Sequence, residues 1–251
     1  MVLYLTLASC AFLAGWLVYR YDMYEREPWY MVLFAVGLGM GVMFVIGYVE
    51  EASLHAISDT PSNVLRAVIA ATHEESARLI VVFGLAIFIR SQFNDPMDGI
   101  IYGCLIGLGM AIDESISFLK LGGNPDYLPP NEIIRMLGHL LMGGITGFGV
   151  GMFRMKMKHW VPVVLGCFSF SILLHFVWNI IAFETGEMGM ATPWMKFWTI
   201  IVMFSCMFFF GFLVVLASEW SRRIFAPDEK HRLWGWPFTL LFRKDKGSET
   251  E

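Results

Sequence analysis

Charged residues are scarce in this chain, and their scarcity argues against an ordinary soluble protein. Only 16% of its 251 residues are Asp, Glu, Lys or Arg, whereas 57% are hydrophobic. The mean hydropathy is +0.60, and soluble domains usually carry about 25% charged residues. The sequence also lacks a basic stripe that would suit nucleic acid, so we expect no nucleic-acid partner. The composition instead predicts a protein that lives in a lipid bilayer.

Paired cysteines are absent as well. The four cysteines, at positions 10, 104, 167 and 206, lie far apart in apolar segments and form no Cys-x-x-Cys motif. We therefore expect them to pack as small hydrophobic side chains. A lipoprotein-like box ends at Cys10, but no basic segment precedes it and the apolar run continues to Val18. A first membrane helix is favoured over a removed signal.

Apolar runs of about 18 or more residues recur along the chain, which predicts an all-α, polytopic membrane protein. We expect seven spans, at residues 2–18, 30–49, 63–89, 97–119, 133–153, 161–183 and 195–217. In this prediction Glu50, Glu51 and His55 fall in a solvated loop. Residues 1–217 form the transmembrane domain, and residues 218–251 form a basic, amphipathic tail on the membrane surface.

Basic residues are distributed unevenly between the two sets of loops. One set, together with the tail, contains Arg20, Arg26, Arg90, Arg154, Lys156 and Lys158. The other set contains Arg66, Lys120, Arg135 and Lys196. The positive-inside rule assigns the first set to the cytoplasm. We therefore expect a multi-pass protein of the cell membrane with its N-terminus outside and its C-terminus in the cytoplasm.

The third expected span contains the charged stretch His73-Glu74-Glu75-Ser76-Ala77-Arg78. A charge near the centre of a bilayer costs roughly 2.5–3.5 kcal/mol by insertion scales. Arg78 can pair with either glutamate along the helix, but one guanidinium cannot neutralise two carboxylates. The second carboxyl is then suited to general acid–base chemistry. The stretch is not a zincin motif, because Ala77 stands where HExxH requires a second histidine.

Three further spans bring polar side chains to the same depth as Glu74 and Glu75. At about 1.5 Å per residue, all of these positions fall between the outer interface and the middle of the membrane. The further residues are Glu114, His139, His175 and Asn179. Taken alone, each has a structural explanation, such as a hydrogen bond between helices. Their shared depth predicts a four-helix catalytic core made of spans three to six.

Glycines in the fourth span point to close packing within this core. Gly99, Gly103 and Gly107 recur every fourth residue and so leave one helix face without side chains. Such small-xxx-small faces let two helix backbones approach closely.

The order of these motifs resembles the PrsW family of membrane proteases, which is similar to CAAX-type prenyl proteases and bacteriocin-immunity proteins. The resemblance begins at the Asp22…Glu27-Pro28 loop and covers most of the chain. It rests on Glu74-Glu75-Ser76-Ala77-Arg78, the segment from Gly107 to Glu114, His139, and the segment from His175 to Asn179. It implies a glutamate-dependent intramembrane peptidase. The implied substrate is a single-pass membrane protein, such as an anti-sigma factor, cut near the extracytoplasmic side.

For this reaction we expect Glu74 or Glu75 to activate water, while Arg78 holds the other glutamate. His139, His175 and Asn179 would polarise the scissile carbonyl. As an alternative, Glu114, His139 and His175 would bind a metal such as zinc. No ligand spacing decides between the two, and carboxylate-activated water is favoured. The rival function is a proton-coupled transporter, but the inverted repeats common in carriers are absent.

Overall fold

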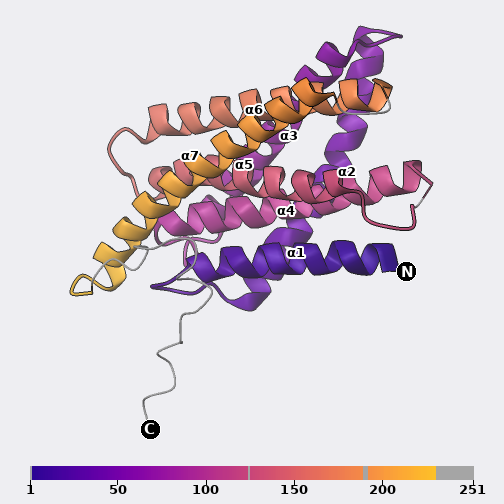
Figure 1. The fold of residues 1–251 in the computed structure, drawn as a ribbon. Helices are drawn as coiled ribbons and strands as arrows, with labels where there is room; N and C mark the ends of the chain where they lie inside the picture. Colours follow the sequence, from indigo (N-terminus) through magenta and orange to yellow (C-terminus); the bar gives the residue numbers. More distant parts are fainter. Residues whose placement is uncertain (1, 124, 189–191, 230–251) are drawn as a thin grey trace.

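The computed structural model describes residues 2–123, 125–188 and 192–229, which fold into seven α-helices (Figure 1). The helices are α1 (Val2–Tyr21), α2 (Trp29–Ile57), α3 (Asn63–Phe88), α4 (Pro96–Leu121), α5 (Pro130–Arg154), α6 (Trp160–Met188) and α7 (Pro193–Phe225). Six of them are long and apolar enough to cross a membrane, and α3, which carries the charged stretch, is not among these. The predicted all-α, polytopic membrane fold is confirmed.

Two helices run further than the sequence suggested. Helix α2 continues to Ile57, so Glu50, Glu51 and His55 lie on a helix and not in a loop. Helix α7 continues to Phe225, past the expected boundary at residue 217. Most of the expected surface tail, residues 230–251, lies outside the described residues.

Helices α4 and α5 pack directly through their backbones. They run side by side through the middle of the bundle, with α1 next to α4 and with α6 and α7 next to α5 (Figure 1). A Cβ atom added to Gly103 would lie 2.1 Å from the Gly143 carbonyl oxygen, and one added to Gly147 would lie 1.9 Å from that of Gly99. Carbon and oxygen atoms that are not bonded do not approach each other so closely, so only glycine fits at these two positions. The predicted small-residue packing is confirmed.

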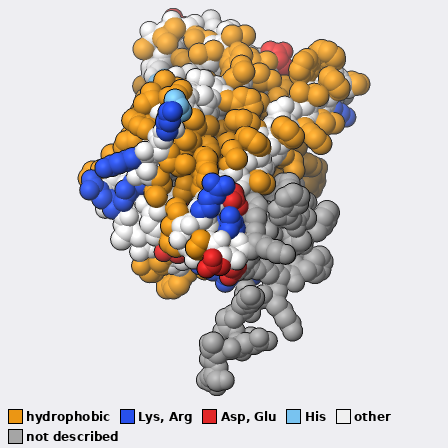
Figure 2. Space-filling view, turned by 90° about the vertical axis from the view of Figure 1, so that its left-hand side faces the viewer, with side chains coloured by type: hydrophobic (Ala, Val, Ile, Leu, Met, Phe, Trp, Pro, Cys, Tyr) orange, Lys and Arg blue, Asp and Glu red, His pale blue; other side chains and the backbone are white. Residues whose placement is uncertain are grey.

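The two ends of the bundle carry different connections. The start of α1 and the end of α7 lie at opposite ends (Figure 1). Figure 2 views the end that holds the α1–α2, α3–α4 and α5–α6 connections, and lysine and arginine side chains gather on it among hydrophobic ones. Large hydrophobic side chains are exposed on the described helices, as lipid contact requires.

A group of buried acids lies where the α1–α2 connection meets the start of α4. Asp22 Oδ2 accepts a hydrogen bond from the Glu27 amide at 2.8 Å, and Glu27 Oε2 accepts one from the Tyr102 hydroxyl at 2.6 Å. Burial, with the nearby Asp95 carboxylate, raises the pKa of Asp22 to about 8, and burial also raises the pKa of Glu27. This end of the bundle therefore holds protons on carboxyl groups in the folded state.

We expect Asp22→Asn to weaken the pH dependence of stability. The unfolded pKa of aspartate is about 3.9, so the unfolded chain releases a proton that folded Asp22 keeps up to about pH 8. Stability is therefore greatest at low pH and is lost as the pH rises toward 8. Asparagine keeps the acceptor oxygen without the charge. The melting temperature of Asp22→Asn in detergent should exceed that of the wild type, by a margin that widens from pH 5 to pH 8.

The exposed Asp59 provides a control for this comparison. Asp59→Asn should follow the wild-type pH dependence. Parallel curves for wild type and Asp22→Asn would show that Asp22 is not the proton-holding group.

Candidate active site

Helix α3 brings three charged side chains into the interior of the bundle. Glu74, Glu75 and Arg78 are only 2%, 0% and 0% exposed. Adjacent helical residues point about 100° apart, so the two glutamates face different neighbours. Glu75 forms a buried ion pair with Arg78 one turn later. Its Oε1 also lies 2.9 Å from Nδ1 of His175 on α6.

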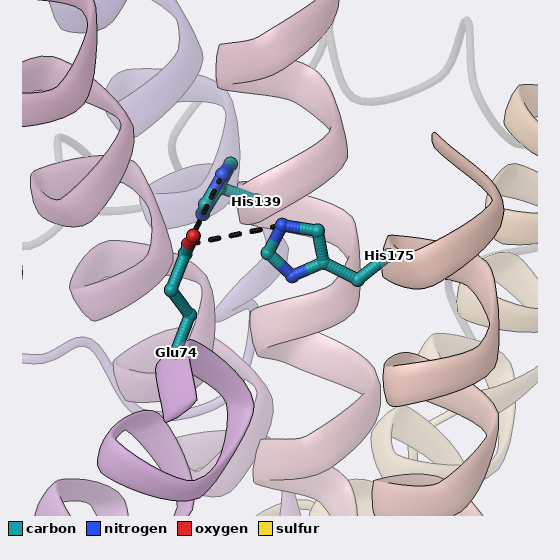
Figure 3. A group of neighbouring side chains, drawn as sticks. All are labelled: Glu74, His139 and His175. Atoms are coloured by element: carbon teal, nitrogen blue, oxygen red, sulfur yellow. Dashed lines mark ion pairs between the residues drawn. The ribbon is translucent and has the colours of Figure 1, made fainter. Parts of the chain in front are cut away.

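Glu74 points instead at two imidazole rings. Its Oε2 lies 3.7 Å from Nε2 of His139 on α5 and 3.7 Å from Nε2 of His175 on α6. Figure 3 shows both rings directed at the end of the Glu74 side chain. The same Oε2 is buried and has no hydrogen-bond partner. Oε2 of Glu75 also has no hydrogen-bond partner, but Glu75 is held by Arg78 and His175 through Oε1, whereas Oε2 of Glu74 faces the two rings.

Their partners give the two histidines opposite hydrogen-bonding roles. Glu75 can only accept as a carboxylate, so Nδ1 of His175 carries the proton and Nε2 presents a lone pair. Arg78 can only donate, and its NH2 group lies 2.9 Å from Nδ1 of His139. The neutral His139 ring then carries its proton on Nε2. The cluster therefore offers one nitrogen acceptor and one N–H donor beside Glu74.

Glu114 completes the cluster from α4. Its Oε2 lies 3.0 Å from Nε2 of His139, and its Oε1 lies 3.3 Å from Nε of Arg135. Arg135 also pairs with Glu132, and its guanidinium carbon lies 4.3 Å from the centroid of the Phe118 ring. Glu114 is thus held between the buried His139 and the Glu132–Arg135 pair near the start of α5.

A cavity of about 700 Å³ connects this cluster to the surface. Glu74, Glu114 and Asn179 form part of its wall. Residues at the starts of α5 and α7 also contribute, so the cavity reaches the end of the bundle opposite the one in Figure 2. Another cavity, of about 550 Å³, lies between α1, α2 and α4 and is lined by none of the predicted site residues.

The structure brings together every site residue that the sequence predicted. Helices α3 to α6 supply Glu74, Glu75, Arg78, Glu114, His139, His175 and Asn179. Sequence reasoning missed Glu50, which lines the same cavity from α2. The available signal was the absence of glycine and proline between residues 48 and 57, which allows α2 to continue.

Comparison with known proteins identifies the family of this chain. The model of the PrsW family of intramembrane metalloproteases matches residues 27–215, which is most of the chain. The chain belongs to the PrsW family. Protease PrsW of Bacillus subtilis strain 168 is 27% identical over 136 residues, which cover 54% of this chain and 62% of that protein. Protease PrsW of Geobacillus kaustophilus is 30% identical over 172 residues, which cover 66% and 74% of the two chains. No solved structure matches.

The PrsW family is described as a family of metalloproteases, and the residues of this chain fit a metal ion. One ligand atom each from Glu74, His139 and His175 lies within 4.8 Å of the others. Two imidazoles and a carboxylate are a common catalytic zinc set, and the buried, unpartnered Oε2 of Glu74 suits a cation. Metal-binding histidines usually donate their other ring N–H to a carboxylate that orients the ring. Glu75 is such a carboxylate, because its Oε1 accepts from Nδ1 of His175.

Two details refine the metal hypothesis. The sequence suggested Glu114 as the third ligand, whereas the structure brings Glu74 to the histidines and pairs Glu114 with Arg135. His139 would have to give up its Nδ1 contact with Arg78, because a metal-binding nitrogen must be deprotonated while the other nitrogen keeps the proton.

Proposed function

We propose that this PrsW-family protein is an intramembrane peptidase that hydrolyses a membrane-anchored protein. The observation that carries the proposal is the environment of Glu74. Its free oxygen is buried, faces Nε2 of both histidines and lies at the wall of a cavity that reaches the surface. A carboxylate in such a place is suited to accept a proton from water and to return it.

The proposed reaction uses the side chains as follows. Glu74 takes a proton from a water molecule, whose oxygen attacks the scissile carbonyl carbon. The Nε2–H of His139 and the amide of Asn179 donate to the carbonyl oxygen as negative charge develops on it. Glu74 then returns the proton to the leaving nitrogen, which yields a carboxylate and an amine. Glu75 fixes the ring of His175, and Arg78 holds Glu75.

A zinc-type ion would be held by Glu74, His139 and His175, and when bound it would lower the pKa of water and polarise the carbonyl. The metal in the family description supports this assignment. In that form the three side chains would act as ligands, and Nε2 of His139 would no longer carry the proton that it donates in the metal-free reaction.

We propose a single-pass protein, cut near its extracytoplasmic side, as the substrate, and an anti-sigma factor as the specific case that the family resemblance implies. The positive-inside rule supports this orientation. Lysine and arginine gather on the end of the bundle seen in Figure 2, and the cavity reaches the other end. The N-terminus would then lie outside and the C-terminus in the cytoplasm.

The test is co-expression with a panel of single-pass membrane proteins. Wild type should cleave at least one of them, and both Glu75→Ala and His175→Ala should abolish that cleavage. The first removes the group that orients the His175 ring, and the second removes the ring itself. Cleavage that persists in both variants would contradict the proposal. Proton-coupled flux in liposomes without any cleavage would favour the transporter. Metal analysis of the purified protein reports whether the three donors hold an ion.

A further inference from the structure

The cavity in front of Glu74 contains a carboxylate that the proposed reaction does not use. Glu50 reaches the cavity from α2, on the same helix face as Met43 two turns earlier. Its side chain is half-buried, and Oε1 is buried without a hydrogen-bond partner. A buried carboxylate oxygen in this state is costly. Glu50 is therefore suited to bind something that enters the cavity.

The other acids of the cavity lie beside basic side chains, although Oε2 of Glu74, like Oε1 of Glu50, has no hydrogen-bond partner. Glu114 and Glu132 both pair with Arg135, and Glu74 faces the two imidazoles. Within the part of the chain that the structure describes, Glu50 forms no ion pair and lies outside the group of possible metal donors. A cation that enters the cavity would supply such a partner.

We propose that Glu50 binds a lysine or arginine side chain of the substrate segment that lies in the cavity. The walls near it are largely apolar, with Met43, Trp178 and Ile200 among the lining residues. The long aliphatic stem of a basic residue can pack on such walls while its charged end reaches a carboxylate. An acidic side chain at that place would be repelled by Glu50 and Glu114. This inference rests on the proposed peptidase function and adds a substrate preference to it.

The test uses a single-pass substrate that wild type cleaves, with its cavity-binding segment made free of charged residues. One lysine is then moved along the segment, one residue at a time, and kcat/KM is measured for each position. For the segment with lysine at one particular position, the kcat/KM of wild type should be about tenfold higher than for the lysine-free segment. The gain should come mainly from a lower KM, because a cation pairs with a carboxylate in low dielectric. Glu50→Gln should reduce this ratio to about one.

A charge reversal makes the test independent of simple loss of function. Glu50→Lys should prefer a segment with glutamate at the position where wild type prefers lysine. Glu51→Gln is the matched control, because Glu51 is the next residue, is exposed and pairs with His55. It should keep the wild-type preference.

Three results would overturn the assignment of Glu50. The first is the absence of any preferred lysine position in wild type, and the second is a preference that survives in Glu50→Gln. The third is a fall in the kcat of Glu50→Gln that is equal for all segments, which would indicate a proton-transfer role. Failure of the peptidase proposal looks different. In that case wild type cleaves nothing, or Glu74→Gln cleaves as well as wild type.

Discussion

Glu74→Gln is expected to reduce cleavage by about a thousandfold while leaving the protein folded. General acid–base groups typically contribute 10²- to 10⁴-fold in rate, and glutamine cannot accept and return the proton. The substitution should cost little stability, because Oε2 of Glu74 makes no hydrogen bond in the folded protein. The measurement is kcat with a single-pass substrate in detergent or bicelles, together with the melting temperature of the same sample.

Glu75→Gln is the informative comparison, because it should also lose activity but for another reason. Glu75 neutralises Arg78 and orients His175, and both partners are buried. Removing its charge leaves a buried guanidinium without a counter-ion, which typically costs about 3–5 kcal/mol. A clear fall in melting temperature should therefore accompany the loss of cleavage. If Glu74→Gln were the unstable variant and Glu75→Gln the stable one, the two roles would be exchanged.

Much of the site could be predicted because helix geometry in a membrane is regular. A fixed rise per residue and a fixed membrane thickness were enough to bring Glu114, His139 and His175 to the depth of Glu74. The contacts agree with that expectation. Depth, however, says nothing about how each helix is rotated toward its neighbours.

The parts that could not be predicted depend on such rotation and on helix ends. Glu74 and Glu75 are the same type of residue and lie at nearly the same depth in the membrane. Glu75 pairs with Arg78 within α3, and the placement of α5 and α6 brings His175 to Glu75 and both imidazoles to Glu74. The sequence predicted a loop at Glu50 because polar residues cluster there, whereas residues 48–57 contain no glycine or proline and α2 continues to Ile57.

Gly107→Ala connects the packing of the bundle to the chemistry, and we expect it to reduce cleavage by about a hundredfold. A Cβ atom at Gly107 would lie 2.1 Å from the carbonyl oxygen of His139. A Cβ atom has a position fixed by its backbone, and its neighbour is a backbone carbonyl oxygen, so no change of side-chain rotamer can relieve the contact. The α5 backbone at His139 must move away from α4, and a misplacement of about 1 Å at a catalytic group can cost 10²-fold in rate.

The control for this prediction is Gly84→Ala on α3, where an added Cβ would meet no atom within 4 Å. It should retain wild-type cleavage. Gly107→Ala should also lower the melting temperature, since overpacking typically costs about 1–3 kcal/mol. The decisive quantity is kcat at a temperature where both variants remain folded. Wild-type kcat in folded Gly107→Ala would show that the exact position of the His139 backbone does not control the reaction. A selective loss of kcat would show that the glycine contact between α4 and α5 sets the distance from His139 to Glu74.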